Sequence, residues 1–292
     1  MPRRSVWTAA SAWHPSKVDR IALLEALGIA AREAGEAIRA VRRRGFEVAH
    51  KGDASPVTEA DHAAERIILD ALARAAPGVP IIAEEEVAAG RIPAHDELYF
   101  LVDPLDGTKE FVRGGDDYTV NIGLIEGGQP VLGVVLAPEQ ERLFSGLVGQ
   151  GAWVEAPGTP RQPLRVRTPG QDLIAVASKS HFTQDTADYL TSLGSACERV
   201  SVGSSLKFCI VAEAKADIYP RLSPTSEWDT AAGHAVLLGA GGAVAAPDGT
   251  SLGYGKPAFL NRGFLATGAW TAPPILPFMT EFAGGGDLPQ GV

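Results

Sequence analysis

Two aspartates lie three residues apart in the segment 103–108, which reads Asp-Pro-Leu-Asp-Gly-Thr and directly follows the apolar run 99–102. The apolar run predicts a buried strand that brings Asp103 to its edge, and Gly107 permits a tight turn immediately after it. Thr108 then brings a hydroxyl back toward both carboxylates. Hard divalent cations such as Mg²⁺ prefer oxygen ligands of this kind. The segment therefore predicts a metal and phosphate site, with helix capping or loop closure as the structural alternative.

Three more acidic clusters lie at the ends of predicted elements. The short apolar run 81–83 continues into three glutamates at 84–86, so a second strand ends in acids. One amphipathic segment begins with the run 58–61, and another begins with 227–230. Asp61 stands three residues after a threonine, the spacing of a capping box, so its carboxylate could serve only the end of its helix.

These motifs, taken in order, resemble one enzyme family. Glu-Glu at 84–85, the run 103–108 and Trp-Asp at 228–229 form the pattern of the inositol monophosphatase-like phosphatases, which depend on Mg²⁺ and are sensitive to Li⁺. Within that family the chain is most similar to the bacterial 3'(2'),5'-bisphosphate nucleotidases of the CysQ type. The narrower resemblance spans about residues 20–268 and rests on the runs 55–58, 103–111, 201–209 and 228–234.

The resemblance implies a site for two Mg²⁺ ions that share Asp103. Glu84, Asp103 and the carbonyl of Leu105 would hold the first ion. Asp103, Asp106 and Asp229 would hold the second, and a third, looser ion would lie near Glu84. Two such ions can hold the phosphate oxygens, lower the pKa of a bound water and stabilise the leaving alkoxide. Water is then the expected nucleophile.

In this family a threonine and an aspartate orient and deprotonate the water, and they map here to Thr108 and Asp61. The backbone N–H groups of Gly107 and Thr108 would cradle the phosphate at a helix start. Taken singly, Lys207 and Arg221 could be ordinary surface charges; as a set that matches the nucleotidase pattern, the basic residues suit a second phosphate. The implied substrate contacts are Glu84, Leu105, Asp106, Gly107, Thr108, Ser178, Lys179, His181, Gly203, Ser204, Lys207, Arg221 and Asp229.

The implied reaction removes the 3'-phosphate of adenosine 3',5'-bisphosphate and gives AMP and phosphate, in sulfur assimilation. The sulfated nucleotide 3'-phosphoadenylyl sulfate is the implied second substrate. An inositol monophosphatase or a fructose bisphosphatase is the alternative, since it would share the metal site and differ in the nucleotide pocket. A non-catalytic binder of nucleotide and metal is disfavoured by the intact set Glu84, Asp103, Asp106, Thr108 and Asp229.

Composition bounds these expectations independently. The 292 residues, 45% of them hydrophobic, suffice for a packed core in one large or two ordinary domains. A net charge of −9 without a long Lys/Arg block argues against polymeric nucleic acid and leaves a small nucleotide bisphosphate as the expected partner. Cys197 and Cys209 form no CxxC pair, which fits a reducing cytoplasm. No apolar run of about 18 residues predicts a membrane-spanning helix.

The two ends, 1–18 and 276–292, are predicted to be solvated tails. The Arg3-Arg4 pair favours an anionic membrane surface weakly, so peripheral association with the inner face of the plasma membrane is the alternative to a wholly cytoplasmic location. The sequence gives no indication of oligomeric state.

Between the tails, hydrophobic spacing predicts an α+β fold. Long helices are expected near 24–41 and 58–75, and an antiparallel meander over 120–125, 131–137 and 143–148. From about 172, shorter strands alternate with helices near 183–193 and 204–213. We expect an α+β domain at 19–156 that carries most metal ligands, a Pro/Gly-rich junction at 157–163, and an α/β domain at 164–275 that carries Asp229 and the nucleotide pocket. The resemblance implies the layered α/β/α/β/α sandwich of the inositol monophosphatase and fructose bisphosphatase type.

Overall fold

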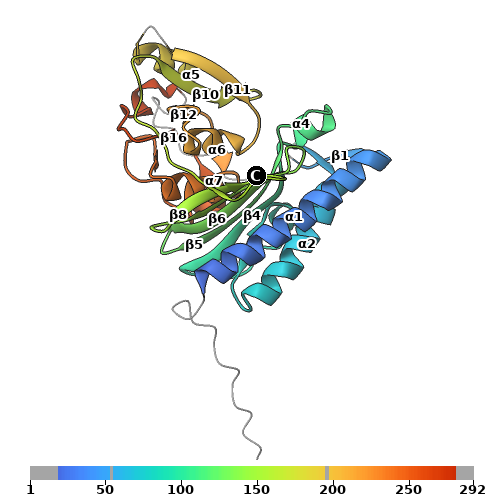
Figure 1. Cartoon of the computed structure of the whole chain (residues 1–292). Coiled ribbons are helices and arrows are strands. Elements are labelled where there is room, and N and C mark those ends of the chain that lie inside the picture. Colours follow the sequence, from blue (N-terminus) through green and yellow to red (C-terminus); the bar gives the residue numbers. More distant parts are fainter. Residues whose placement is uncertain (1–18, 53–54, 195–196, 281–292) are drawn as a thin grey trace, which may run out of the picture.

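The computed structural model describes residues 19–52, 55–194 and 197–280. A large sheet runs through the middle of the molecule in the order β3-β4-β5-β6-β7-β8-β9. Neighbouring strands in this sheet are antiparallel except for the parallel pair β3 and β4 (Figure 1). The predicted meander is confirmed. The strands are β3 (Ile81–Ala83), β4 (Leu98–Asp106), β5 (Thr119–Glu126), β6 (Gln129–Ala137), β7 (Arg142–Leu147), β8 (Gly151–Glu155) and β9 (Gln162–Pro163).

A second, mixed sheet has the order β11-β10-β12-β16-β14. Its first three strands are parallel to one another, and β16 runs antiparallel to both of its neighbours. The strands are β10 (Leu173–Ser178), β11 (Cys197–Val202), β12 (Ile218–Arg221), β14 (Ala243–Ala245) and β16 (Phe264–Thr267). Two small antiparallel pairs complete the strands: β1 (Val48–His50) with β2 (Pro56–Thr58), and β13 (Thr225–Ser226) with β15 (Leu260–Asn261).

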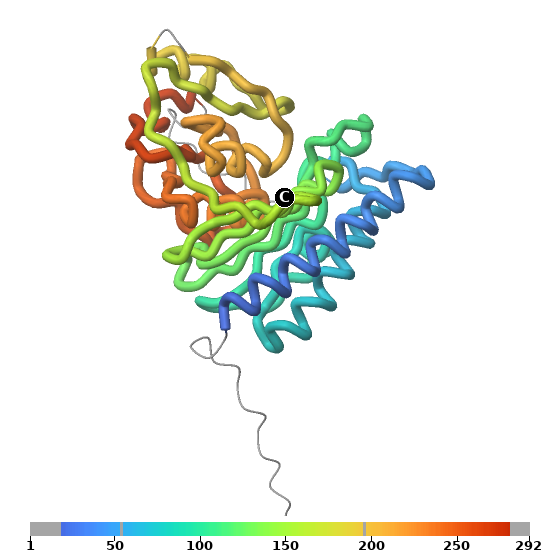
Figure 2. Tube along the Cα trace, in the orientation of Figure 1, coloured from blue at the N-terminus to red at the C-terminus, as the bar shows by residue number. Residues whose placement is uncertain are grey.

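Helices cover and separate the two sheets. The helices α1 (Arg20–Arg44) and α2 (Glu59–Ala75) pack together on one face of the large sheet, and α6 (Leu206–Ala212) and α7 (Trp228–Gly239) lie between the sheets. The Cα trace in Figure 2 shows the same order of layers. The remaining helical segments are α3 (Glu84–Ala88), α4 (Thr108–Val112), α5 (Gln184–Ser192), η2 (Pro257–Phe259) and η3 (Leu276–Phe278).

The alternation of side chains along the strands accounts for these layers. On β4, Phe100 belongs to the core under α1 and α2, whereas the next residue, Leu101, belongs to the core around α6 and α7. On β10, Val176 joins that middle core, whereas Ala175 faces a third core with α5. Successive strand residues point to opposite faces, so two sheets with both faces buried need three cores. The predicted five-layer α+β sandwich is confirmed.

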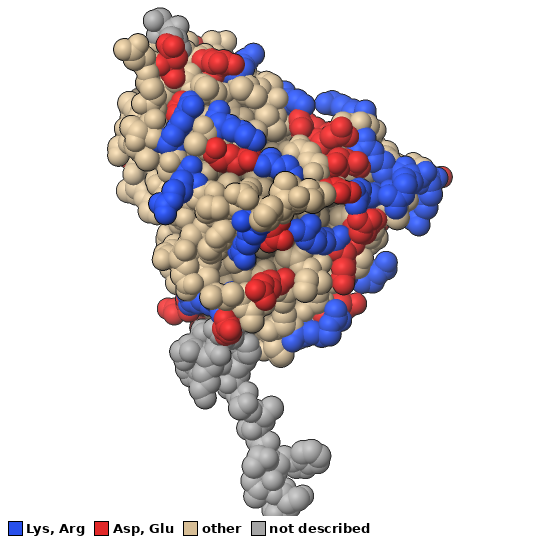
Figure 3. Space-filling model, viewed as in Figure 1, with Lys and Arg blue, Asp and Glu red and all other residues tan. Residues whose placement is uncertain are grey.

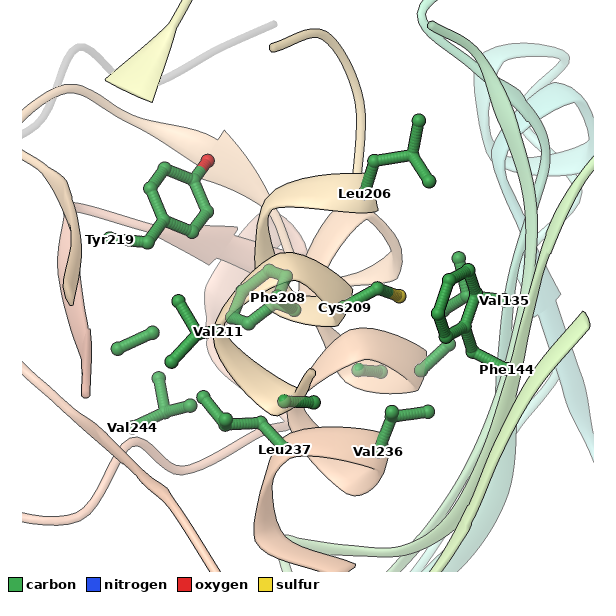
Figure 4. Close-up of a cluster of buried hydrophobic side chains, with 14 of the residues drawn as sticks. Val135, Phe144, Leu206, Phe208, Cys209, Val211, Tyr219, Val236, Leu237 and Val244 are labelled. Carbon is green, nitrogen blue, oxygen red and sulfur yellow. The ribbon is translucent and has the colours of Figure 1, made fainter. Parts of the chain in front are cut away.

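The middle core is shown in Figure 4. Cys209 of α6 points toward Phe144 on the large sheet, while Val211 lies on the side of Tyr219 on the second sheet. Both cysteines are free thiols, and Cys209 is fully buried. The same core joins residues from both proposed parts of the chain, so the division at 157–163 stays a proposal about chain organisation.

The helix α7 differs from its prediction. The sequence predicted an amphipathic segment from 227–230 onward, but nearly every residue of Trp228–Gly239 is buried. A helix between two sheets has no solvent-facing side, so it carries no polar stripe.

Three glycines allow α7 to lie close to the large sheet. Gly123, Gly133 and Gly146 stand side by side on β5, β6 and β7, because Gly133 pairs with both of the others. A Cβ on Gly133 would lie 2.7 Å from the carbonyl oxygen of Ala232 in α7. Asp229 is in the first turn of that helix, so this glycine row sets how closely Asp229 approaches the sheet.

The chain ends also refine the prediction. The boundary at 275 is too early, since Leu276–Phe278 form η3 and Met279 is buried in the third core. Residues 1–18, including Arg3-Arg4, and residues 281–292 lie outside the described part of the chain. Within the described part, no helix is both long and apolar enough to cross a membrane.

Charged side chains are mixed over the face shown in Figure 3, and basic ones gather at one tip. Figure 1 places the C-terminal end of α1 at this tip, and the last turn of that helix contains Arg42, Arg43 and Arg44. Cations at a helix C-terminus interact favourably with the helix dipole. Positive charge is therefore concentrated where the dipole of α1 favours it.

Candidate active site

The strand β4 delivers the acidic motif in a way the sequence did not predict. The backbone stays extended as far as Asp106 instead of turning after Val102, with an irregular register to β5 between Asp103 and Asp106. The turn comes at Gly107, which has a left-handed φ of +94°. A Cβ there would lie 2.9 Å from the carbonyl oxygen of Asp117. Glycine is therefore required for conformation and for space.

A cavity of about 670 Å³ opens beside this turn. It lies among β4, the start of α4, the end of β10 and the N-terminal ends of α6 and α7. The structure thus brings nearly all of the predicted site residues to one place. Those that line the cavity are Glu84, Asp103, Leu105, Asp106, Gly107, Thr108, Ser178, His181, Gly203, Ser204, Lys207, Arg221 and Asp229.

Four carboxylates converge on the acidic end of this cavity. Asp103 is 2% exposed, and burial together with Glu84, Asp106 and Asp229 raises its pKa well above the usual range. Burial, followed by the charges of Asp106 and Glu84, raises the pKa of Asp229 to about 7. Mutual repulsion of this kind is relieved by a cation, so the cluster is built to receive positive charge.

Lys51 supplies part of that positive charge in this structure. Its Nζ lies 2.6 Å from Glu84 Oε1 and 2.6 Å from Glu85 Oε1. Burial alone would lower the pKa of Lys51, but the two glutamates raise it. The ammonium is therefore held charged next to one of the predicted metal ligands.

The ligand atoms fit a hard divalent cation. All of the predicted donors are oxygens, including the Leu105 carbonyl, whose residue donates its N–H to Asp103 Oδ1 over 3.0 Å. Among the residues that the structure describes, no three acidic, histidine or cysteine side chains form a preformed metal cage. Mg²⁺ does not require one, because it commonly keeps several waters and completes its coordination with substrate phosphate.

Hydrogen bonds direct the two aspartates expected at the second ion. Asp229 Oδ2 accepts from the Thr225 hydroxyl and, over 3.2 Å, from the Ser226 N–H. Asp106 Oδ2 accepts from Ser205 Oγ over 2.7 Å. In each carboxylate these bonds restrict the side chain and engage one oxygen, as expected for groups that orient a metal ligand.

Asp61 contacts both the start of its helix and Thr108. Its Oδ2 accepts from the Thr58 N–H over 2.7 Å, which closes the capping box of α2. Its Oδ1 accepts from Thr108 Oγ1 over 3.2 Å. Burial raises the pKa of Asp61, against the hydrogen bonds from Thr58. A buried carboxylate beside a hydroxyl at the cavity edge can accept a proton.

Two basic residues, Lys207 and Arg221, line the same cavity. Lys207 is 2% exposed, so it is not an ordinary surface charge. Its Nζ donates to the carbonyls of Val202 and Ser204 and lies 5.1 Å from the centre of the Tyr219 ring. Burial lowers its pKa to about 8. Within the described chain Lys207 forms no salt bridge to a carboxylate.

The other basic residues are placed differently. Arg221 lines the cavity and donates to the carbonyls of Ser223 and Pro224. Lys179, which was predicted to contact substrate, does not line the cavity; it pairs with Asp117 instead.

The sequence of residues 21–275 matches the inositol monophosphatase family. The chain belongs to this family. It is 45% identical over 248 residues to the 3'(2'),5'-bisphosphate nucleotidase CysQ of Salmonella typhimurium, a match that covers 84% of this chain and 99% of that protein. It is also 34% identical over 232 residues to inositol monophosphatase 2 of Solanum lycopersicum, covering 76% of this chain and 86% of that one.

A solved structure of the same family supports the fold. The CysQ protein of Bacteroides thetaiotaomicron, a bacterial family member, superimposes with a TM-score of 0.72 at 34% identity. The match covers 85% of this chain and 98% of that one. Family membership makes the chain a metal-dependent phosphatase, and Mg²⁺ is the usual metal.

Four residues of the site were missed from the sequence. Asn121 had a signal, because a polar residue interrupts the apolar strand β5. Ser205 lies inside the run 201–209, which carries part of the family resemblance, but the run itself does not indicate a contact with Asp106. Thr225 lies four residues before Asp229 without a recognisable pattern. Lys51 reaches Glu84 only through the β1–β2 pair, so no sequence spacing could reveal it.

This chain also contains a Gly-x-Ser-x-Gly pattern that lies away from the candidate site. Residues 249–253 read Gly-Thr-Ser-Leu-Gly, which matches the nucleophile pattern of another hydrolase class. Ser251 is exposed and hydrogen-bonds to Gln129 over 3.4 Å. It does not line the candidate cavity.

We expect ionisation of Asp229 to lower the thermal stability of the metal-free protein as the pH rises from about 4 to about 7. The pKa of Asp229 is raised to about 7, so folding favours its protonated form. The resulting stabilisation is present at low pH and is lost as the pH rises through about 7. Scanning calorimetry in EDTA measures this fall in Tm. Added Mg²⁺ binds the ionised carboxylates, so its increase in Tm should grow with pH.

The control for this pH dependence is Asp229→Asn, whose neutral amide does not titrate in this range. The variant should show a flatter Tm profile in EDTA than the wild type. If the difference in Tm between wild type and Asp229→Asn in EDTA stayed the same from about pH 4 to about pH 8, the raised pKa of Asp229 would be contradicted.

Proposed function

We propose that this protein is an Mg²⁺-dependent phosphatase that removes the 3'-phosphate of adenosine 3',5'-bisphosphate. One observation carries the proposal: the same cavity is lined by an all-oxygen acidic ligand set and by the buried ammonium of Lys207. The first suits the phosphate that is hydrolysed, and the second suits another anionic group on the same substrate. The relatives named as 3'(2'),5'-bisphosphate nucleotidases support this substrate class.

The acidic end would hold the metal ions. We assign Glu84, Asp103 and the Leu105 carbonyl to one ion, and Asp103, Asp106 and Asp229 to a second, with a third, looser ion near Glu84. Bound Mg²⁺ supplies charge neutralisation of the phosphate and lowers the pKa of water. The carboxylates themselves orient these donors and keep the phosphate at this end of the cavity.

Thr108 and Asp61 would orient the attacking water and remove its proton. Thr108 Oγ1 lies within hydrogen-bond distance of Asp61 Oδ1 and of the Leu105 carbonyl, at 3.2 and 3.0 Å. When the threonine proton is directed to Asp61, a lone pair on Oγ1 is free to accept a proton from water. The water proton then passes to Thr108 as the threonine proton passes to Asp61. The raised pKa of Asp61 favours this acceptance.

Lys207 would bind the second phosphate. A buried ammonium without a carboxylate partner is unfavourable, because carbonyl oxygens replace only part of its hydration. An anionic phosphate in the cavity restores that missing interaction. Ser204 and Arg221 line the same wall and supply further donors. A monophosphate substrate has no second phosphate there and gains nothing from Lys207.

The proposal is tested first by phosphate release in the presence of Mg²⁺. Adenosine 3',5'-bisphosphate, inositol 1-phosphate and fructose 1,6-bisphosphate are compared at equal concentration, with an EDTA control. We expect a strong preference for the nucleotide and no release in EDTA. A preference for inositol 1-phosphate would retain the metal chemistry and establish the alternative activity that the tomato relative's name carries. Activity unaffected by EDTA would contradict the metal assignment.

Replacing Lys207 by methionine tests the second phosphate directly. Lys207→Met keeps an unbranched side chain of similar length and removes the charge. We expect kcat/KM for adenosine 3',5'-bisphosphate to fall about 10- to 100-fold, since a hydrogen bond to a charged group contributes about 1.5–3 kcal/mol. Hydrolysis of inositol 1-phosphate should change less than threefold, roughly the scatter of a site without that contact.

Lys215→Met is the matched control, because Lys215 is exposed, pairs with Glu213 and lies outside the cavity. It should leave both substrates unaffected. Equal losses with both substrates in Lys207→Met would show that Lys207 is structural, and the nucleotide assignment would fall.

A further inference from the structure

Ser205 occupies an unusual position between two expected ligands of one metal ion. Its Oγ lies 2.7 Å from Asp106 Oδ2, and 2.6 Å from the main-chain carbonyl oxygen of Asp229. Asn121 Nδ2 donates to the same Oγ over 3.0 Å and to Asp106 Oδ2 over 3.3 Å. Ser205 is 2% exposed and Asn121 is fully buried. One hydroxyl therefore connects β4, β5 and the first turn of α7.

The backbone around Ser205 is fixed from several sides. The preceding residue, Ser204, has a left-handed φ of +49°, which is uncommon outside glycine. A Cβ on Gly203 would lie 2.6 Å from the carbonyl oxygen of Asp117. This close approach holds the segment before α6 against the loop that follows α4. Ser205 is thus placed by the backbone and does not depend on its own side chain for position.

The hydroxyl has one proton and two acceptors. Asn121 donates to Oγ, so the Ser205 proton is free to point either to Asp106 or to the Asp229 carbonyl. When the Ser205 proton is directed to Asp106, Ser205 and Asn121 both donate to Oδ2 of that carboxylate. When the proton is directed to the Asp229 carbonyl, Ser205 donates to the first turn of α7 instead. Both arrangements fix the distance between the strand that carries Asp106 and the helix that carries Asp229.

We propose that Ser205, supported by Asn121, is a positioning residue that presents Asp106 and Asp229 together to one Mg²⁺ ion. The inference rests on the proposed function, because it takes these aspartates as ligands. It assigns to Ser205 a role through Asp106 and not through contact with substrate. Hydrogen-bond partners of metal ligands typically contribute about 10- to 100-fold in metal affinity.

The test is calorimetric titration of Mg²⁺ into the metal-free full chain, without substrate. Ser205→Ala removes the hydroxyl and should raise the Mg²⁺ dissociation constant about 10-fold or more. At saturating Mg²⁺ the KM for adenosine 3',5'-bisphosphate should stay within about twofold of the wild type, because the lost contact is to the ligand and not to substrate. Ser145→Ala is the matched control, since Ser145 is a buried serine of β7 that accepts from Arg161, away from the cavity.

Two results would overturn the inference while the proposed function stands. One is a wild type that binds Mg²⁺ and a Ser205→Ala variant with the same dissociation constant. The other is a KM for adenosine 3',5'-bisphosphate at saturating Mg²⁺ that rises well beyond twofold in Ser205→Ala, which would make Ser205 a substrate contact. Ser205→Cys, which replaces a strong donor by a weak one at similar size, gives the same comparison if the alanine variant does not fold. A wild type that binds no Mg²⁺ would overturn both the inference and the proposed function.

Discussion

Replacing Asp103 by asparagine is expected to abolish phosphatase activity and, at the same time, to stabilise the metal-free protein. Asp103 is the carboxylate shared by both proposed ions, so its loss should lower kcat/KM by about 10³-fold or more, in keeping with the several kcal/mol that such ions contribute. The stabilisation has a separate cause. Burial and the charges of Glu84, Asp106 and Asp229 raise the pKa of Asp103, so its ionised form is unfavourable in the folded state.

An asparagine keeps the acceptor for the Leu105 N–H and removes the charge. The Tm of Asp103→Asn in EDTA should therefore exceed that of the wild type, and by more as the pH rises and more of the wild-type carboxyl ionises. Asp96→Asn, a change at an exposed aspartate, is the control and should change neither kcat/KM nor the Tm in EDTA. A variant that is inactive but also less stable in EDTA would show that Asp103 stabilises the fold, contrary to the electrostatic argument.

The second large effect is expected from a residue that bears no functional group. Gly133→Ala places a Cβ 2.7 Å from the carbonyl oxygen of Ala232, a backbone atom that cannot rotate away. Either α7 moves off the sheet or β6 bends, and overpacking of this kind costs about 1–3 kcal/mol of folding free energy. Because Asp229 is in the first turn of α7, we also expect the Mg²⁺ affinity and kcat/KM to fall at least about 10-fold.

Calorimetric unfolding and Mg²⁺ titration measure the two consequences separately. Gly170→Ala is the matched control, since a Cβ there meets no heavy atom within 4 Å. It should leave both quantities unchanged. If Gly133→Ala lowered the Tm but left Mg²⁺ binding intact, the glycine row would matter for packing alone and would not position Asp229.

Much of the fold could be predicted because its signals are local. The capping box of α2, the three-four spacing of α1 and the glycine pair between β5 and β6 each depend on residues close together in the sequence. The position of α7 could not be predicted in this way. An evenly apolar helix has no face that indicates its partner, and only the paired strands show that Gly133 and Gly146 form part of one surface.

In the candidate site, too, residues close together in the sequence could be predicted, and contacts between distant residues could not. The acidic motif was visible because its members lie within six residues of each other, and the resemblance supplied Asp61 and Asp229. Lys179 was overpredicted because adjacency in sequence does not fix the direction of a side chain, and this one turns to Asp117. For Ser205 the sequence predicted too little. Its run was recognised, but its link from Asp106 to α7 exists only after the two sheets have come together.

The contact of Lys51 with Glu84 bears on the apparent affinity of the site for a metal ion. An ion that binds Glu84 would meet a carboxylate whose Oε1 already lies 2.6 Å from the Lys51 ammonium. The two cations would compete for the same carboxylate, so the observed binding free energy would be reduced by the part of the Lys51 attraction that the ion weakens. An internal competitor of this kind lowers the apparent affinity without weakening any ligand.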